Sequence, residues 1–190
     1  MTGRAAKTVR ADAHRNRERL VEAARRSFSQ AGGKVPLEAV AREAGVGIGT
    51  LYRHFPTREA LVEAVYRAEL RRLCESAAEL LEREEPARAL RSWMDRFADY
   101  VATKQHMAEA LRALIAAGTV TVSQARAELS EAVRTLLDAG SAAGALRGDV
   151  RAEDVVACVV GVFVTCDASD PEQAGRMLDL LLDGLRPRPA

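Results

Sequence analysis

The residues with the clearest chemical potential lie in one short segment near the N-terminus. Thr50 and Arg53 combine a hydroxyl, a methyl group and a guanidinium, which are groups that read base edges in the major groove of DNA. Tyr52 and His54 suit hydrogen bonds to phosphates, which fix the register of a protein on DNA. Arg58 fits the same role a few residues later. The spacing indicates nucleic-acid binding rather than catalysis.

These residues belong to a pattern of two short helices separated by a glycine-containing turn. Residues 37–44 and 48–55 each predict one to two helical turns, and the turn covers residues 45–47. This pattern is typical of a helix-turn-helix, whose second helix enters the major groove. Small and apolar residues are placed to fill the interface between the helices: Ala41, Ala44, Val46 and Leu51.

The flanking segments predict longer helices that hold this motif. Residues 10–31 carry apolar residues at helical spacing, and residues 58–83 continue the pattern after Pro56, with Thr57 as a suitable N-cap. Before them, Arg4, Lys7 and Arg10 predict a flexible basic arm that follows the DNA backbone or enters a minor groove.

The rest of the chain predicts five further helices, for a total of about nine in an all-α fold. A capping box at Thr121 and Gln124 is expected to start one of them. The β-branched stretch at residues 155–164 also fits a buried strand, but we predict a helix because no second strand is available to pair with it. The five helices are expected near residues 86–101, 104–116, 121–139, 155–164 and 170–185.

The formal net charge of +1 conceals a strong asymmetry along the chain. Residues 1–58 carry 12 Lys and Arg against 5 Asp and Glu, a net charge of +7, whereas residues 59–190 carry 16 against 22, a net charge of −6. A basic part beside an acidic part is a hint of nucleic-acid binding by the basic part. We therefore expect a DNA-binding domain at residues 1–58 and a second domain at residues 59–190.

Several classes of protein are excluded by what the sequence contains. Cys74, Cys158 and Cys166 are odd in number and lack metal-site spacing, which argues against a disulfide framework and a metal site and leaves a redox role for Cys158 or Cys166 open. The longest apolar run is too short for a membrane span, and the N-terminus has no export signal, so we expect a cytoplasmic protein. The sequence shows no nucleophile paired with a base, no carboxylate pair and no cofactor motif, so it does not predict an enzyme.

The stretch from Ala41 to Leu61, AREAGVGIGTLYRHFPTREAL, resembles the TetR/AcrR family of transcriptional regulators. The resemblance covers residues 10–65 and extends to the nine-helix layout. It implies a homodimer with an N-terminal three-helix DNA-binding domain. It also implies a C-terminal helical domain that binds a small ligand and dimerises through its last two helices, at about residues 152–186.

Two residues depart from the family pattern at the starts of the two short helices. Pro36 and Gly47 stand where members often carry a Ser or Thr that caps the helix and contacts a phosphate. Backbone N–H groups at the helix ends would then make those phosphate contacts. The expected DNA-binding residues are Gly47, Gly49, Thr50, Tyr52, Arg53, His54, Arg58 and Arg10.

Six large apolar residues of the second domain are candidates for lining a ligand cavity between helices. An ordinary core is the alternative for each of them, and Thr103, Arg112 and Thr165 are equal candidates for polar contacts with a ligand. The six residues are Trp93, Phe97, Tyr100, Met107, Leu111 and Phe163.

The function that follows is a ligand-responsive, homodimeric repressor that binds a palindromic operator. A ligand that favours one dimer conformation would change the separation of the recognition helices, through the helix at residues 58–83. Two alternatives stay open: a helical enzyme or small-molecule carrier with a vestigial helix-turn-helix, and an adaptor that uses the apolar face at residues 177–185.

Overall fold

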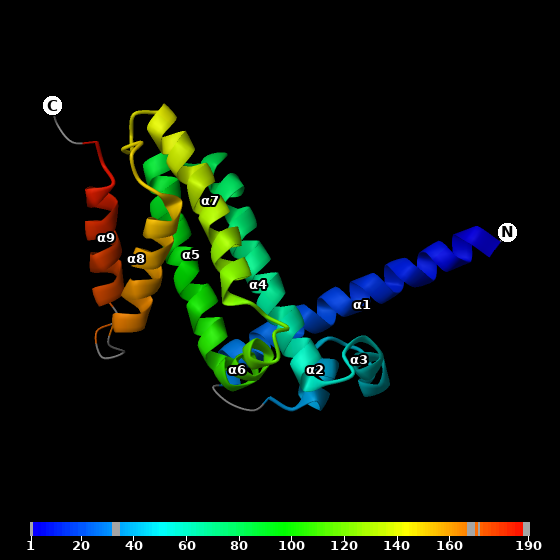
Figure 1. Ribbon diagram of the computed structural model, residues 1–190. Helices are drawn as coiled ribbons and strands as arrows, with labels where there is room; N and C mark the ends of the chain where they lie inside the picture. The colour runs from blue at the N-terminus through cyan, green and yellow to red at the C-terminus, as the bar shows by residue number, and fades with distance from the viewer. Residues whose placement is uncertain (1, 32–34, 167–169, 171, 188–190) are drawn as a thin grey trace. The chain divides into compact units, whose positions relative to one another are not determined.

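The fold consists of helices alone in the part of the chain that the structure describes. The computed structural model describes residues 2–31, 35–166, 170 and 172–187, with side chains in the first helix from Asp12 to Ser29. Nine helices and no strand are found within these residues (Figure 1). The all-α prediction is confirmed. No helix in the same residues is both long enough and apolar enough to cross a membrane.

The helix-turn-helix pattern and the long helices after it occur where the sequence predicts them. The residues at 155–164 are helical, so the choice of helix over strand is confirmed. The nine helices are α1 (Thr2–Ala31), α2 (Leu37–Glu43), α3 (Ile48–His54), α4 (Arg58–Leu81), α5 (Pro86–His106), α6 (Ala108–Ala116), α7 (Val122–Ala142), α8 (Ala152–Thr165) and α9 (Gln173–Gly184).

The structure corrects the prediction of a flexible basic arm at the N-terminus. Helix α1 begins at Thr2, so the backbone of the segment with Arg4, Lys7 and Arg10 is helical. After Gly3 the segment contains neither Gly nor Pro and is rich in Ala, Lys and Arg, which favour a helix. In Figure 1 this half of α1 extends past α2 and α3.

One helix start and one helix cap further along the chain also differ from the prediction. Helix α5 continues to His106, so α6 begins only at Ala108. Lys104 and His106 lie in the last turn of α5, where basic side chains complement the helix dipole. The predicted capping box is wrong, because Thr121 makes no side-chain cap hydrogen bond. Gln124 instead donates to the carboxylate of Glu128, 3.1 Å away and one turn along α7.

The chain divides into two compact units. The first contains Met1–Ala68 and Ala102–Val120, and the second contains Glu69–Val101 and Thr121–Ala190. Helices α4 and α5 each begin in one unit and end in the other. These ranges do not coincide with a boundary at residue 58, so the division into functional domains at 1–58 and 59–190 stays a prediction.

In the first unit, α1, α2 and α3 pack against one another around apolar side chains. The core includes residues from each of these helices and from the start of α4. Burial of each large side chain contributes on the order of 1.5–3 kcal/mol to folding. Side chains at most 2% exposed include Leu20, Ala24, Phe28, Val40, Leu51, Phe55 and Leu61.

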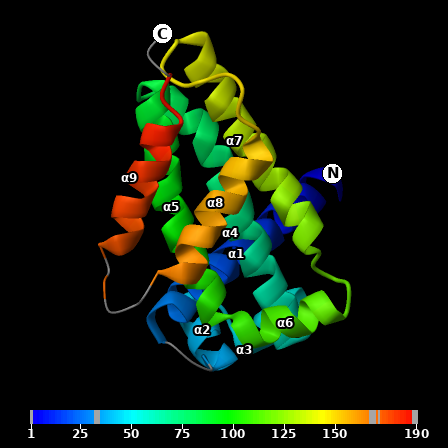
Figure 2. The same cartoon turned by 60° about the vertical axis from the view of Figure 1, so that its left-hand side comes forward.

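In the second unit, α7 packs on α8 and α8 packs on α9, and the last two helices lie side by side (Figures 1 and 2). A polar contact also joins α5 to α9. Arg91 on α5 donates from Nε to the carboxylate of Asp179 at 2.6 Å and from Nη2 to the carbonyl of Gly175 at 3.4 Å. Arg91 thereby fixes α9 against the bundle.

Candidate nucleic-acid interface

Helix α3 is attached to its unit through one buried residue, and four of its other residues are exposed. Leu51 is fully buried and is the only buried residue of the helix, whereas Tyr52 and Arg53 are exposed. Successive residues of an α-helix are about 100° apart, so the face opposite Leu51 carries Gly49 and Arg53. This exposed face is the surface that a helix-turn-helix presents to DNA.

The turn before α3 is fixed by backbone hydrogen bonds. Gly45 has a left-handed backbone with φ of +65°, which glycine adopts without strain. Its N–H donates to the carbonyl of Arg42 at 3.0 Å, and the N–H of Val46 donates to the carbonyl of Ala41 at 3.0 Å. These are the two bonds of a Schellman motif, and they set the direction in which the chain enters α3.

Arg19 of α1 approaches the same turn closely. Its Nη2 lies 3.5 Å from the carbonyl oxygen of Gly45, and a Cβ atom added to Gly45 would lie 2.6 Å from that nitrogen. The backbone angle is what favours glycine here, because the Arg19 guanidinium is the end of an exposed, flexible side chain that could move aside.

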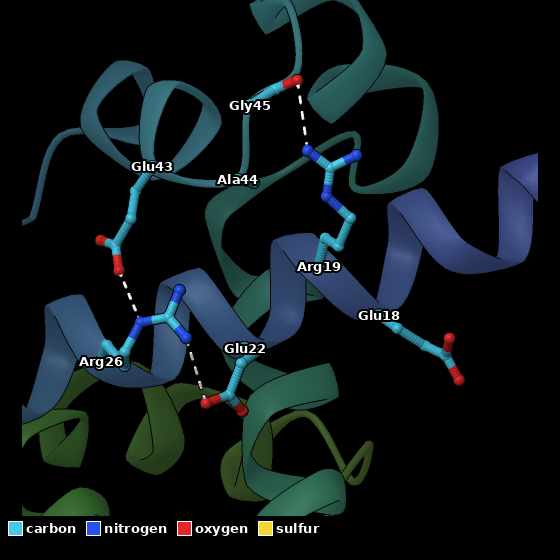
Figure 3. A pocket seen from close by; sticks show the side chains of 7 residues that line it. All are labelled: Glu18, Arg19, Glu22, Arg26, Glu43, Ala44 and Gly45. Carbon is cyan, nitrogen blue, oxygen red and sulfur yellow. Dashed lines mark hydrogen bonds and ion pairs between the residues drawn. The ribbon is translucent and has the colours of Figure 1, made fainter.

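Ion pairs hold α2 on α1 beside the turn (Figure 3). Arg26 donates to the carboxylate of Glu43 at 2.7 Å, and the hydroxyl of Ser27 donates to the other carboxylate oxygen at 2.8 Å. Arg26 also pairs with Glu22 on its own helix at 3.3 Å. The three charged residues of these ion pairs, Glu22, Arg26 and Glu43, line an open cleft of about 380 Å³ together with Glu18, Arg19, Ala44 and Gly45. The hydrogen bonds from Arg26 and Ser27 lower the pKa of Glu43.

Thr50 and Arg53, the predicted base-reading residues, are joined on the surface of α3. Arg53 donates from Nε to the carbonyl oxygen of Gly49 at 3.1 Å and from Nη2 to the hydroxyl oxygen of Thr50 at 3.0 Å. Both bonds use the side of the guanidinium that faces the helix. The N–H groups at its outer end point away from these two acceptors.

Tyr52 and His54, predicted to contact phosphates, lie at different depths. The side chain of Tyr52 is 46% exposed, whereas His54 is half-buried and its ring lies 6.4 Å from that of Phe55. Phe55 is buried, and the guanidinium of Arg17 lies 5.1 Å from the centre of its ring, close enough for a cation–π contact. Arg17 therefore joins α1 to the C-terminal end of α3, which sequence spacing alone does not reveal.

Arg58 has a structural contact that the sequence does not predict. Its Nη1 donates to the carbonyl oxygen of Val35 at 2.5 Å, and its guanidinium lies 5.6 Å from the centre of the Phe28 ring. The neighbouring Thr57 accepts from the N–H of Ala60 at 3.1 Å, so its predicted role as helix cap is confirmed. Arg58 therefore holds the segment before α2, and its predicted phosphate contact stays a prediction.

The remaining predicted DNA-binding residues lie at the start of α3 and in α1. Gly47 is the N-cap of α3 and makes no side-chain cap hydrogen bond, and Gly49 lies in the first helical turn. Neither has an atom within 4 Å of the place where a Cβ would lie. Arg10 belongs to α1, but its side chain is outside the described residues. Phosphate contacts at these positions stay predictions.

Four of the six predicted ligand residues form an aromatic cluster in the second unit. Phe97 lies at its centre, with ring-centre distances of 5.8 Å to Trp93, 5.5 Å to Tyr100 and 5.7 Å to Phe163. The indole N–H of Trp93 donates to the carbonyl of Leu73 at 3.0 Å. Trp93, Phe97 and Tyr100 are buried, and Phe163 is half-buried.

Met107 and Leu111 are buried in the first unit, so the structure brings four of the six predicted ligand residues together. Two of the candidate polar residues bond within their own helices: Arg112 donates to the carbonyl of Ala108 and Thr165 to that of Gly161. Thr103 is buried, with its hydroxyl 3.5 Å from that of Ser29.

The three cysteines differ in their surroundings. Burial, assisted by Glu128 and Glu75, raises the pKa of Cys74 to about 11, which keeps its thiol protonated at neutral pH. Cys158 is exposed, and the thiol of half-buried Cys166 lies 3.7 Å from the sulfur of Met177. Within the described residues, no three His, Cys, Asp or Glu side chains gather in a way that would hold a metal ion.

The all-helical fold with an exposed α3 defines a helix-turn-helix transcriptional regulator, and comparison with known proteins specifies the family. Residues 20–65 match the model of the bacterial regulatory proteins of the tetR family, and residues 85–187 match that of the C-terminal domain of SbtR-like transcriptional regulators. The chain therefore belongs to the TetR family of transcriptional regulators, with a DNA-binding helix-turn-helix and a C-terminal domain.

Two solved structures are similar over almost the whole chain. The TetR transcriptional regulator SCO0520 from Streptomyces coelicolor is 48% identical, with a TM-score of 0.81, over 91% of this chain and 99% of that one. A TetR transcription regulatory protein from Mycobacterium vanbaalenii is 35% identical, with a TM-score of 0.74, over 94% and 99%.

Among curated relatives, the similarity is confined to a shorter stretch. An HTH-type transcriptional regulator of Staphylococcus aureus is 38% identical over 63 residues, which are 33% of this chain. The match spans about a third of the length of that relative, at 34%.

The first prediction concerns the ion pairs that hold α2. Because the pKa of Glu43 is lowered in the folded protein, its contribution to stability is complete above the ordinary glutamate value of 4.5 and is lost as the pH falls through the lowered pKa. We expect Glu43→Gln to lower the thermal midpoint at pH 7 by about 1–3 °C, since ion pairs at exposed positions contribute little. Thermal melts followed by circular dichroism measure this difference.

The difference between the melts of the variant and the wild type should narrow as the pH is lowered from 4.5 toward 3. Glu82→Gln is the control, because it removes an exposed carboxylate outside this network. A decrease in the thermal midpoint of Glu43→Gln that is equal at pH 7 and pH 3 would contradict the assigned role of the carboxylate.

Proposed function

We propose that this protein is a ligand-responsive transcriptional repressor that binds a palindromic operator as a homodimer. The observation that carries the proposal is the outer surface of α3, where exposed Arg53 lies opposite the buried Leu51 and is hydrogen-bonded to Thr50 beside it. The net charge of +7 over residues 1–58 supports the attraction of this part to phosphates. We also propose a cytoplasmic location, because such a regulator acts on the DNA of the cell.

Arg53 is the residue that we assign to base recognition. Its bonds to Gly49 and Thr50 use the N–H groups on the Nε side. The outer pair of N–H groups is then directed away from the helix, in the parallel geometry that matches O6 and N7 of guanine. Thr50 accepts a hydrogen bond from Arg53, so its own hydroxyl hydrogen is available for a phosphate or a base.

Other residues around α3 are assigned to the DNA backbone. Tyr52 and His54 are placed to donate to phosphates, and the bare backbone at Gly47 and Gly49 allows a phosphate to approach α3 closely. Arg10 would contact the duplex from a helical segment rather than from a flexible arm. Neutralising phosphates in this way releases counterions, so binding weakens steeply with salt.

The homodimer is proposed to form through α8 and α9, at about residues 152–186. Two large apolar side chains on these helices are strongly exposed: Val164 is 76% exposed and Leu180 is 72% exposed. Covering them with the same surface of a second copy removes this apolar area from water, and two-fold dimers are the commonest oligomers. A two-fold dimer presents two copies of α3, which explains a palindromic operator.

The effector is proposed to bind at the aromatic cluster of α5 and α8. Trp93, Phe97 and Tyr100 come from α5, and Phe163 comes from α8, one of the two proposed dimer helices. A ligand that separates Phe163 from Phe97 would therefore act directly on the dimer. Because half-sites must be about 34–36 Å apart or a multiple of that spacing, a dimer with another spacing loses the operator.

The second prediction tests base recognition by Arg53. Selection from random duplex DNA should yield a palindrome with guanine at one fixed position in each half-site. Arg53→Lys keeps the positive charge but loses the paired donors, so we expect it to lose about tenfold or more in preference for guanine at that position. Titrations of the selected duplex and of its single-base variants measure the preference.

Arg112→Ala on α6 is the matched control, since it removes one exposed arginine outside α1–α3. Its base preference should equal that of the wild type. Selection that enriches no palindrome at any ionic strength would refute the proposed function.

The third prediction tests the dimer surface. Leu180→Glu places a charge where the proposed interface is apolar, so we expect a monomer with a mass near 20.6 kDa and an unchanged helical content. Sedimentation equilibrium measures the mass. Val122→Glu, at a residue 50% exposed on α7, is the control and should remain a dimer. A dimeric Leu180→Glu variant would place the interface elsewhere.

The fourth prediction tests the effector site through Trp93, the single tryptophan of the chain. A small molecule that releases the protein from the selected operator should lower the operator affinity by about tenfold or more. The same molecule should shift or quench the tryptophan fluorescence. Phe163→Ala should weaken the response of the fluorescence. If molecules that release the operator leave Trp93 emission unchanged, the effector binds away from this cluster.

A further inference from the structure

Ile48, the first residue of α3, is an exposed aliphatic side chain that the function proposed above does not use. It is 38% exposed, and Tyr52 is 46% exposed. Among the described residues of α1, α2 and α3, these two are the only exposed large apolar side chains. They lie one helical turn apart, so they form a continuous apolar edge along α3.

Helix propensity gives no reason for an isoleucine at this position. β-branched residues are poor at stabilising helices, and burial of this side chain is incomplete. The buried anchor of α3 is Leu51, which has no exposed surface. Ile48 therefore contributes less to the core than an apolar residue of its size would if it were buried.

The two neighbouring glycines leave Ile48 prominent. Gly47 has an ordinary backbone with φ of −72° and ψ of 150°, and neither Gly47 nor Gly49 has an atom within 4 Å of a would-be Cβ. The fold thus accepts side chains at both positions. Because residues 47 and 49 have no side chains, Ile48 is the only residue among the three whose side chain projects from the first turn of α3.

The setting of this side chain identifies its partner as DNA rather than an apolar protein surface. The same short helix carries Arg53, exposed and with donors directed outward, and the segment of residues 1–58 has a net charge of +7. On the base edges of the major groove, the only apolar group is the C5 methyl of thymine. An aliphatic side chain on a helix in that groove gains most by contacting this methyl.

We propose that Ile48 is a specificity-determining residue that recognises thymine through its C5 methyl group. The inference rests on the proposed function and adds a second base to the half-site. Ile48 and Arg53 are five residues apart, or about 7.5 Å along the helix axis. They also point about 140° apart around that axis, so the thymine is a different base from the guanine that Arg53 contacts.

The experiment replaces thymine by deoxyuridine, which pairs identically and lacks only the methyl group. Each thymine of the selected operator is replaced in turn, symmetrically in both half-sites, and affinity is measured for the full-length protein. At one symmetric position the wild type should lose about fourfold in affinity when one half-site carries deoxyuridine, and about fifteenfold when both do. Ile48→Ala should bind the thymine and deoxyuridine operators equally.

Ile115→Ala is the matched control, because Ile115 on α6 is also an isoleucine that is 38% exposed. It should keep the full sensitivity to deoxyuridine. Replacing a cytosine by 5-methylcytosine at the same position of a mutated operator should restore part of the affinity for the wild type and none for Ile48→Ala. Thermal melts establish that the Ile48→Ala variant is folded.

The outcomes separate this inference from the proposed function. If the wild type selects a palindrome but no deoxyuridine replacement changes its affinity, Ile48 does not recognise thymine and the regulator remains. The same conclusion follows if Ile48→Ala keeps the sensitivity. A protein that selects no DNA overturns both.

Discussion

The burial of Leu51 is the interaction on which the DNA-reading surface depends. Helix α3 has seven residues, and an isolated helix of that length is unstable in water because too few hydrogen bonds offset the ordering of its backbone. Leu51, with no exposed surface, joins α3 to the core that α1 and α2 provide. The remaining residues of α3 are then free to be chosen for what they contact outside the protein.

Backbone and charge contacts complete what this one side chain begins. The turn at Gly45 sets where α3 starts, Glu43 attaches α2 to α1, and Arg17 covers Phe55 at the other end of α3. Each contact joins residues that are distant in sequence or depends on a particular backbone angle. Together they give a seven-residue helix the fixed orientation that base recognition requires.

The sequence predicts the all-α fold and the short helices well, because Gly45, Pro56 and the spacing of apolar residues are local signals. It does not predict the partners of charged side chains. Arg58 fits a phosphate contact by position, yet it bonds to the Val35 carbonyl, since tertiary packing brings the two together. Ile48 is overlooked for a similar reason: hydropathy alone assigns an isoleucine to a core, and only its exposure in the folded chain shows otherwise.

The attachment of Arg53 to its own helix has a consequence for conformational entropy. A free arginine side chain loses rotamer freedom worth on the order of 2 kcal/mol when it is fixed in one geometry. Bonds to Gly49 and Thr50 restrict Arg53 before any DNA is present. Part of that ordering is therefore completed when the protein folds. Without the Thr50 hydroxyl, part of the entropy cost of ordering Arg53 would arise on DNA binding instead of on folding. Such a substitution would remove no contact between Arg53 and a base.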